Sequence, residues 1–441
     1  MDRRRNRNTN ISRLSELPNH VLLKIIDLLP FREERIKIYT LSKRFHRLIY
    51  LAKIVQIDDG LVPDQQSIRD GVGFIDRFFD YQNNEAIDDF TVIFSRDHGD
   101  EELLKRVGEI WVRRALLRSV KFLYLHIDTT AQTQNNFFLP RSLFESTSLE
   151  VLVLEFVREA GNIVIQVPNR VSLTTLRHLK ISGIRFEDGE SLERLLTGCT
   201  VLQQLSMINC DLATQEIFRI SQTSVETLEI AVNSRRNYEV NLPALLKVYI
   251  LLTVPAQHMD DNYGVNFLRL FEHARTVRLE ADGIPQLTNG FLGGTDEPVP
   301  VQLNWVELIL VPTDHMDYTT YRWISLFLHF LPKLSRLDLN LEGLLLPDEF
   351  SGSQSLPPCL ASGLQEVEIY TNISGQPVRT IVDYFLMNGA VLRSFIISTP
   401  DAAVKTELTA QVGFMKALMV SGECEIKVKL AGGGVYRRRS P

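Results

Sequence analysis

Apolar residues recur along most of the chain in one six-residue pattern, with leucine or another bulky apolar residue at the first, fourth and sixth positions. Eleven copies follow one another, 20 residues (Leu228 to Val248) to 31 residues (Val306 to Leu337) apart. The better copies read LEVLVL, LRHLKI and LSRLDL. The central apolar residues of the copies are Leu123, Leu152, Leu179, Leu205, Leu228, Val248, Val277, Val306, Leu337, Val367 and Phe395.

Each copy alternates apolar and polar residues, which predicts a half-buried strand. The spacing leaves room for a returning segment, so successive strands should be parallel. Several returning segments are helical: in DGESLERLLTGC, Leu192, Leu195 and Leu196 share one face and Gly198 ends the helix. Strand, turn and helix at a near-constant period indicate a leucine-rich-repeat solenoid. We expect an irregular α/β solenoid of about 11 to 13 parallel strands, with helices on its convex side.

The first fifty residues have a different pattern. Leu17-Pro18 opens a helical pattern that ends at Pro30, a second uses Ile36 and Tyr39, and a third begins at Ser42, a good N-cap. Three short helices in about forty residues bury too little apolar surface to stand alone. Two explanations remain: these helices dock on a partner protein, or they form an ordinary helical cap on the repeats.

This segment resembles an F-box of the plant type, with LPNHVLLKIIDLLP followed by LSKRF. The spacer before Leu41 is one residue longer than the usual pattern, and Phe45 stands where tryptophan is common. The resemblance implies a three-helix module that binds the adaptor linking it to a cullin scaffold, as part of an SCF-type ubiquitin ligase. The adaptor-binding residues that it implies are Leu17, Pro18, Val21, Leu22, Ile25, Leu29, Leu41 and Phe45.

The resemblance extends along the chain to plant F-box/leucine-rich-repeat proteins with a C-terminal FBD module. The segments IWVRRALLRSVKFLYLHI and LERLLTGCTVLQQLSMINC resemble the repeats of that class, and PPCL with YFLMN resembles the FBD module. The expected organisation is a disordered basic tail (1–10), an F-box (11–51), a helical linker (52–89), a solenoid (90–400, with 357–400 FBD-like), a capping helix and strand (401–430) and a disordered tail (431–441).

Composition and motifs limit the compartments, ligands and activities that the sequence predicts. Four widely spaced cysteines without a C-x-x-C pair indicate buried thiols in a reducing compartment. A formal charge of −6 gives no support to nucleic-acid binding, and no apolar run is long enough to cross a bilayer. We therefore expect a cytoplasmic or nuclear protein that binds neither nucleic acid nor membrane. No catalytic motif, metal site or cofactor motif stands out, and the acidic clusters near His98 and His315 are typical of solvated loops.

Recognition therefore falls to the strand residues that point away from the helices. In the second half these residues are acidic, with interspersed arginine and aromatic residues, a composition typical of protein-binding surfaces. The candidate substrate-binding residues are Arg278, Glu280, Trp305, Glu307, Arg336, Asp338, Glu366 and Glu368. We expect a substrate protein with a basic patch there, although a merely solvated face has the same composition.

The sequence thus predicts a non-catalytic receptor subunit of an SCF-type ubiquitin ligase, which binds the adaptor through its first helices and a target protein through its repeats. The alternative is a non-catalytic leucine-rich-repeat scaffold with no role in ubiquitin ligation, in which the first helices only cap the array.

Overall fold

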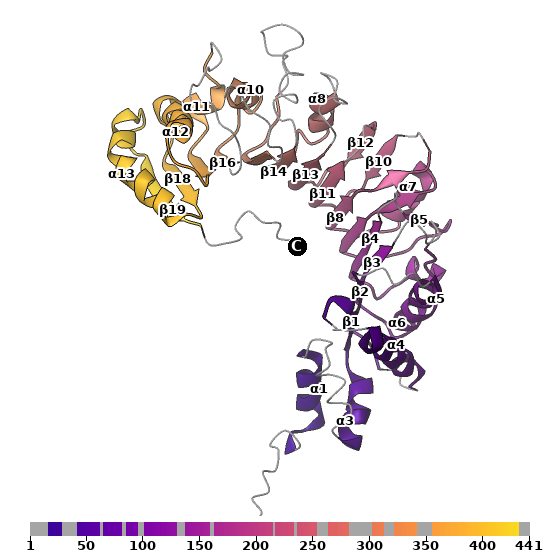
Figure 1. Ribbon diagram of the computed structural model, residues 1–441. Helices are drawn as coiled ribbons and strands as arrows, with labels where there is room; N and C mark the ends of the chain where they lie inside the picture. The colour runs from indigo at the N-terminus through magenta and orange to yellow at the C-terminus, as the bar shows by residue number, and fades with distance from the viewer. Residues whose placement is uncertain are drawn as a thin grey trace, which may run out of the picture. The chain divides into compact units, whose positions relative to one another are not determined.

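The structure, a computed structural model (Figure 1), describes residues 16–28, 42–61, 65–81, 85–95, 101–129, 137–158, 163–214, 217–232, 236–253, 263–281, 302–312, 322–341 and 355–431. The chain divides into two compact units. Unit 1 consists of residues 1–202 and 211–214, and unit 2 consists of residues 203–210 and 215–441.

Unit 1 is built on five parallel strands in the order β1-β2-β3-β4-β6. Their bounds are β1 Ile54–Asp58, β2 Asp89–Phe94, β3 Phe122–Thr129, β4 Val151–Arg158 and β6 His178–Ser182. Alternate residues such as Phe90, Leu123 and Leu152 are paired in register and buried. Burying one face of each strand fixes this register, because a slip of one residue would expose the whole apolar set.

Helices cover the buried side of these strands (Figure 1). The bounds are α4 Gln65–Asp80, α5 Glu101–Lys105, the π-helix η4 Arg106–Trp111, α6 Val112–Leu117, η5 Arg141–Leu143 and α7 Gly189–Thr197. The indole of Trp111 donates to Asp76 of α4 at 2.8 Å, which links η4 to α4. Gly108 is required in η4, because a Cβ there would lie 2.2 Å from the carbonyl oxygen of Phe138.

A short second sheet in unit 1 joins β5 (Ile163–Ile165), β7 (Ile184–Phe186) and β9 (Asp211–Leu212) in parallel. Gly183 makes the turn between β6 and β7 with a φ of 67°, and a Cβ at this position would lie 1.8 Å from the oxygen of Phe156. Only glycine combines this left-handed backbone with such a close approach.

Unit 2 carries nine further parallel strands in the order β8-β11-β13-β14-β15-β16-β17-β18-β19. Their bounds are β8 Gln204–Ile208, β11 Thr227–Val232, β13 Lys247–Leu252, β14 Thr276–Ala281, β15 Glu307–Pro312, β16 Arg336–Asn340, β17 Glu366–Tyr370, β18 Ser394–Thr399 and β19 Glu425–Leu430. A separate parallel pair joins β10 (Phe218–Ser221) and β12 (Tyr238–Asn241).

The helices of unit 2 lie along one side of its strands (Figure 1). Their bounds are α8 Tyr263–Arg269, α10 Arg322–His329, α11 Pro358–Ser362, α12 Gln376–Asn388 and α13 Ala402–Leu418. The core between helices and strands contains Trp305 and Phe327, whose rings lie 6.3 Å apart, and Phe271, whose backbone oxygen accepts from the Trp305 indole at 2.9 Å. The carboxylate of Asp401 accepts from the backbone of Ala403 and so caps α13.

The predicted solenoid is confirmed: the strands are parallel, their order follows the sequence, and helices alternate with them. The sheet order includes fourteen strands in the described part of the chain, one more than the expected upper number. The additional strand is β1, within the segment 52–89 that we expected to be a helical linker. That segment does contain α4, but Ile54–Asp58 alternates buried and partly exposed residues and pairs with β2, so the array already begins there.

One repeat has a different register from the predicted one. The strand β15 aligns Leu308, not Val306, with Val277 of β14 and Leu337 of β16. LNWVEL fits the repeat pattern as well as WVELIL does, but Trp305 is buried in the core before the strand begins. Glu307 consequently shares a row with Thr276 and Arg336 instead of with Arg278 and Asp338.

The N-terminal segment contains α1 (Asn19–Leu28), α3 (Lys43–Leu48) and the short η2 (Ile49–Leu51). The expected second helix around Ile36 and Tyr39 lies outside the described residues, as do both expected tails apart from Ala431. None of the described helices is long and apolar enough to span a bilayer.

Candidate interaction surfaces

The two N-terminal helices are joined by a side chain from the LSKRF motif. Arg44 of α3 donates to the carbonyl of Leu17 at 2.6 Å and to the side-chain oxygen of Asn19 at 2.7 and 2.9 Å. The two ends of the motif are therefore in contact across 27 positions of sequence. At the other end of α1, Asp27 accepts from the backbone of Lys53 and Ile54, which ties α1 to the start of β1.

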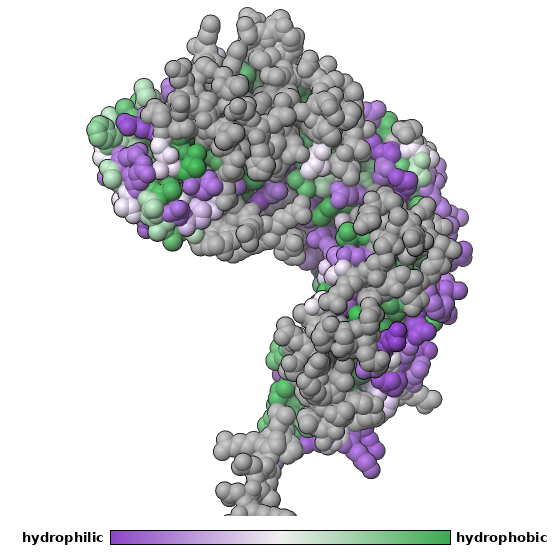
Figure 2. All heavy atoms as spheres, in the orientation of Figure 1, coloured by the Kyte–Doolittle hydropathy of each residue, from purple (hydrophilic) through white to green (hydrophobic). Residues whose placement is uncertain are grey.

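Helical periodicity divides the apolar residues of α1 into two stripes. Leu22 and Ile26 point inward and are buried, whereas Val21 and Ile25 are only partly covered. Leu28 completes the outer stripe at the helical spacing and is 83% exposed. Hydrophobic residues reach the surface in this region, as Figure 2 shows. We did not predict Leu28 as a contact residue, although its spacing of three from Ile25 could have identified it.

This division corrects part of the predicted adaptor-binding set. Leu22 and Phe45 are buried within the chain, where they hold α1 and α3 against η2, so their side chains do not form a free contact surface. Pro18 is exposed, and Leu17, Val21 and Ile25 are partly exposed, so for these four the prediction stands untested. Leu29 and Leu41 lie outside the described residues.

In unit 2, the predicted substrate-binding residues are mostly brought together on the strand face opposite the helices, with one exception. Trp305 is fully buried on the helical side, so its prediction as a substrate contact is wrong. The physical reason is the register of β15: Trp305 precedes the strand, and its indole donates to Phe271 in the core.

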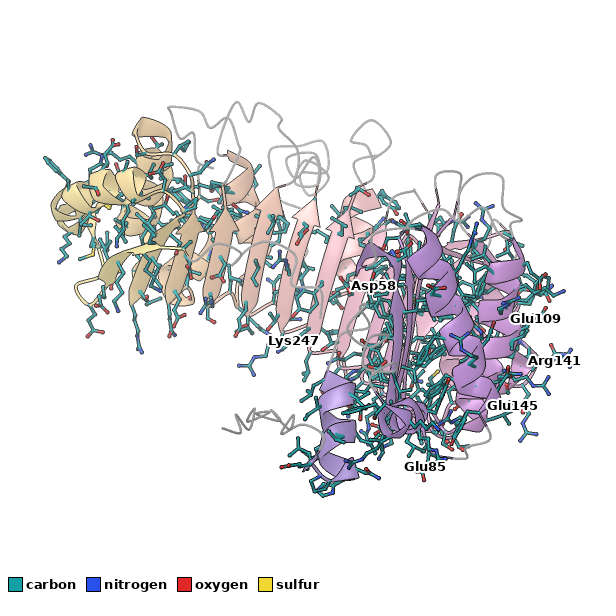
Figure 3. The ribbon with its side chains drawn as sticks, turned by 60° about the horizontal axis from the view of Figure 1, so that its bottom comes forward. Asp58, Glu85, Glu109, Arg141, Glu145 and Lys247 are labelled. Atoms are coloured by element: carbon teal, nitrogen blue, oxygen red, sulfur yellow. The ribbon has the colours of Figure 1, made fainter. Side chains whose placement is uncertain are left out.

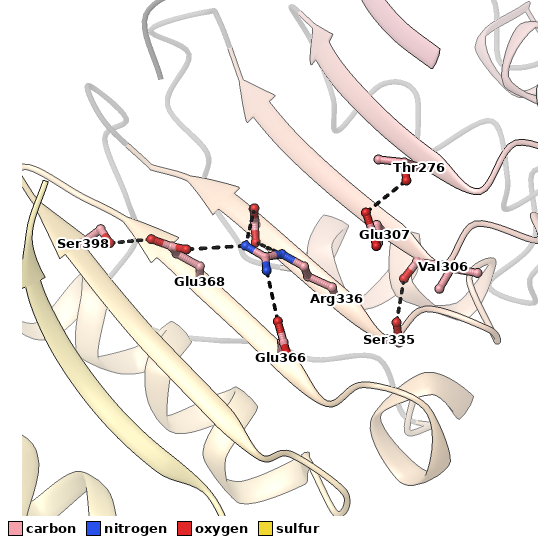
Figure 4. Close-up of polar contacts among 9 residues, drawn as sticks. Thr276, Val306, Glu307, Ser335, Arg336, Glu366, Glu368 and Ser398 are labelled. Atoms are coloured by element: carbon pink, nitrogen blue, oxygen red, sulfur yellow. Dashed lines mark hydrogen bonds and ion pairs between the residues drawn. The ribbon is translucent and has the colours of Figure 1, made fainter. Parts of the chain in front are cut away.

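Arg336 lies at the centre of the largest charged cluster on this face (Figure 4). Its guanidinium contacts Asp338 at 3.1 Å, Glu366 at 3.1 Å and Glu368 at 3.7 Å. Asp338 is only 8% exposed, and this burial raises its pKa, although the hydrogen bond from Arg336 opposes the shift. Glu368 also accepts from the hydroxyl of Ser398 at 2.6 Å.

The other predicted residues of this face are also satisfied internally. Arg278 and Glu280, two positions apart on β14, form an ion pair of 2.6 Å. Glu307 accepts a hydrogen bond of 3.0 Å from Thr276 on the neighbouring strand. The face therefore keeps an acidic excess. Most of its charged side chains are already paired with neighbouring residues, however, which weakens their attraction for a binding partner.

Unit 1 has its own polar cluster on the corresponding strand face. Glu155 of β4 accepts from Tyr124 at 2.7 Å, pairs with Lys180 at 3.0 Å and contacts Nδ1 of His126 at 3.1 Å. Nε2 of the same imidazole lies 3.1 Å from Asp128. Burial opposes ionisation of Glu155, but the hydrogen bonds outweigh it and lower its pKa to about 2. Hydrogen bonding to Glu155 raises the pKa of His126.

A hollow of about 300 Å³ lies beside this cluster. It is lined by side chains from three adjacent strands, namely Gln56, Asp58, Asp89, Thr91, Ile93, Phe122 and Tyr124. Figure 3 shows Asp58 on its strand, apart from Glu109, Arg141 and Glu145, which project from the helical side of the unit. We did not predict this hollow. The alternating polar residues of FTVIF were the available signal, but β1 was not recognised as its neighbour.

The described residues contain no group of three or more side chains suited to holding a metal ion. His98 and His315 lie outside them. Cys199 and Cys359 are buried, which raises the pKa of each thiol to about 12 and makes both poor nucleophiles. The described surfaces offer apolar, aromatic and charged side chains for binding.

Comparison with known proteins fits this picture. A family model described as the LRR repeats of the FBD-associated F-box protein At5g56370 matches residues 109–268. The chain is 24% identical to the F-box/FBD/LRR-repeat protein At5g22660 of Arabidopsis thaliana over 471 residues, which cover 96% of this chain and 97% of the relative. It is 23% identical to the FBD-associated F-box protein At4g10400 of the same plant, covering 94% and 99%.

Over most of its length the chain is similar to plant F-box/FBD/LRR-repeat proteins. The expected F-box (11–51) contains α1 and α3, and the expected FBD-like module (357–400) contains β17, α12 and β18. This segment continues the array of strands, since β17 pairs in parallel with β16 and β18. The names of these relatives describe modules and specify no enzymatic activity.

Proposed function

We propose that this protein is the substrate-recognition subunit of an SCF-type ubiquitin ligase, acting in the cytoplasm or nucleus. Its F-box segment would bind the cullin-linking adaptor, and its repeats would hold a target protein. The protein itself would supply no chemistry. Holding a target beside the transferring enzyme raises the effective concentration of the reacting groups, which is how tethering accelerates a reaction.

The observation that carries the proposal is the outward apolar stripe of α1. Val21, Ile25 and Leu28 remain at the surface although α1 is fixed at both ends by Arg44 and Asp27. A cap that only closed the array would bury such residues against it, since exposed apolar stripes on a fixed helix are typical of docking sites. The similarity to F-box proteins supports the adaptor as the proposed partner.

The test is capture of the purified cullin-linking adaptor by the full-length chain. Replacing Val21 and Ile25 together by aspartate should weaken capture more than about 10-fold, because two charges would be placed in an apolar contact. Leu22→Asp is unsuitable, since Leu22 is buried and its loss would unfold the segment. The matched control is His20→Asp, which adds one charge at an exposed position outside the stripe.

The result that contradicts the proposal is equal capture by the parent and the double variant, or no capture by a parent chain that is folded by circular dichroism. The second result would favour the alternative, a leucine-rich-repeat scaffold with no role in ubiquitin ligation.

A further inference from the structure

The last strand of unit 2 lies at the edge of its sheet. β19 ends the order of the sheet and pairs with β18 (Figure 1), and among the described residues no strand pairs with its other side. An edge strand of this kind is a template for pairing with another chain. We propose that β19 pairs with β19 of a second copy of this protein, antiparallel and about a twofold axis at Ile426. This pairing requires neither the adaptor nor a target protein, and therefore goes beyond the proposed function.

The backbone of β19 directs hydrogen-bonding groups to this edge. The N–H of Glu425 donates to the carbonyl oxygen of Arg393 at 2.8 Å, and the N–H of Ala431 donates to that of Thr399 at 2.8 Å. Alternate residues of a strand bond to the same neighbouring strand, so the residues at odd positions bond to β18. Ile426 consequently directs its N–H and C=O groups away from β18. In the proposed pair it would exchange two hydrogen bonds with Ile426 of the second copy.

The exposed charges of β19 have opposite signs on the two sides of Ile426. Glu425 precedes it and Lys427 follows it, their side chains are 65% and 49% exposed, and they form an ion pair of 2.6 Å. In an antiparallel pair, directly opposite residues project from the same face, and at the non-hydrogen-bonded positions their Cα atoms lie about 4.5 Å apart. A twofold axis at Ile426 therefore places Glu425 of each copy opposite Lys427 of the other. The four charges then alternate in sign, and the ion pair within each chain is kept.

The same charges disfavour the neighbouring registers. Lysine on an edge strand ordinarily opposes pairing with another chain. An axis at Glu425 or at Lys427 would place that residue opposite its own copy, and an axis at Val428 would place Lys427 opposite Lys429. Like charges directly opposite each other destabilise a strand pair, whereas opposite charges stabilise it. The axis at Ile426 is the choice that turns these edge charges into favourable contacts between two copies.

The apolar side of β19 also fits a second copy. Exposure increases along this row, since Ile426 is 8% exposed, Val428 is partly exposed and Leu430 is 51% exposed. In the proposed register Ile426 meets Ile426 of the second copy, and Val428 meets the apolar side of Cys424. One pair of edge strands buries less area than a stable dimer needs, so association should be weak and should depend on protein concentration.

Sedimentation velocity of the full-length chain at increasing protein concentration tests this pairing. The parent chain should pass from monomer to dimer. Glu425→Lys and Lys427→Glu should each weaken self-association at least about 5-fold, because two attractive contacts become two repulsive ones. An equal mixture of these two variants should recover dimers, since each reversed charge then meets an opposite charge on the other chain. The matched control, Glu145→Lys, reverses an exposed charge in unit 1 and should associate as the parent does.

A parent chain that stays monomeric at every concentration would overturn the inference and would leave the edge to a strand of another kind. Single variants that associate as tightly as the parent would overturn it as well, because the dimer would then use a different surface. The same holds for a mixture that associates no better than either variant alone, since the charges of β19 would then not meet across a twofold axis. Circular dichroism of each variant checks that these exposed substitutions leave the fold intact.

Discussion

The strand faces of units 1 and 2 have the same backbone pattern but hold their charges differently. In unit 2 three ion pairs join residues two positions apart on one strand, namely Arg278 with Glu280, Arg336 with Asp338 and Glu425 with Lys427, and Arg336 also reaches Glu366 and Glu368 on the next strand. In unit 1 the cluster around Glu155 crosses three strands, and two further carboxylates line a hollow that has no described basic residue.

This difference shows that a charged side chain is available for binding only when it is not already paired within the chain. Composition alone therefore does not decide which face can bind. Our sequence interpretation placed recognition in the second half because charged residues are frequent there. Residues at i and i+2 share a face, so opposite charges at that spacing pair with each other before they meet a partner. An interpretation based on the repeats also missed Asp58 and Asp89, because both lie in segments without an obvious repeat.

The largest expected effect concerns the cross-strand cluster of unit 1. Glu155→Gln should lower the free energy of unfolding at pH 7 by up to about 3 kcal/mol, the value of a pKa difference of about 2.5 units at 1.36 kcal/mol each. Its side chain is 17% exposed, so solvent screens it little. Because its folded pKa is lowered, this contribution is present above the unfolded pKa and is lost as the pH falls from about 4.5 towards 2.

Urea unfolding at pH 7 and at pH 3 measures this contribution, with Glu145→Gln, an exposed glutamate of the same unit, as the control. A loss of the same size at both pH values would show that charge is not what Glu155 contributes.

The next effect concerns the cluster of unit 2. Arg336→Met removes the cation that three carboxylates share and should cost about 1–2 kcal/mol of unfolding free energy, discounted because Arg336 is 43% exposed. Asp338 already has a raised pKa, so its protonation becomes easier still without Arg336. Stability that depends on a raised carboxyl pKa increases as the pH falls, and the defect should therefore shrink between pH 7 and pH 4.

Lys247→Met is the matched control for this measurement, since Lys247 is exposed in the same row of the face. If the Arg336 variant were as stable as the control variant at pH 7, the cluster would be a surface arrangement of no energetic consequence.

A smaller effect distinguishes two histidines of unit 1. The pKa of His126 is raised, so its stabilisation is present below the unfolded pKa and is lost as the pH rises through the folded value. His126→Gln should therefore remove about 0.5–1 kcal/mol at pH 6 and less at pH 8. His178 is the internal control, because burial lowers its pKa and its replacement should change stability in the opposite sense over the same range. Parallel pH profiles for the two variants would contradict these assignments.

Much of the fold was predictable because it depends on local alternation. Leu179, Leu205 and Leu228 are the centres of regular copies, and all three are buried in parallel strands. The prediction failed where two readings of one segment were equally apolar. Val306 and Leu308 both fit the pattern, and only the burial of Trp305 selects between them, which depends on contacts with Phe271 that are distant in sequence.

The candidate sites were less predictable because exposure is a tertiary property. Leu22 and Ile25 are similarly apolar and belong to the same motif, yet Leu22 is buried beside α3 and η2 whereas Ile25 stays partly exposed. The hollow depends on the pairing of β1 with β2, and β1 was not recognised because its five residues, IVQID, lie outside the repeat pattern.

The smallest expected effect tests whether pairs along one strand matter energetically at all. Lys427 and Glu425 lie 2.6 Å apart on β19, but both side chains are about half exposed or more. Lys427→Ala should change the free energy of unfolding by no more than about 0.5 kcal/mol, and the change should vanish in 1 M salt, where exposed charges are screened within about 3 Å. A cost above about 1 kcal/mol that persists in salt would mean that pairs along a strand stabilise unit 2 as strongly as the cross-strand cluster stabilises unit 1, because a screened exposed pair cannot supply that much.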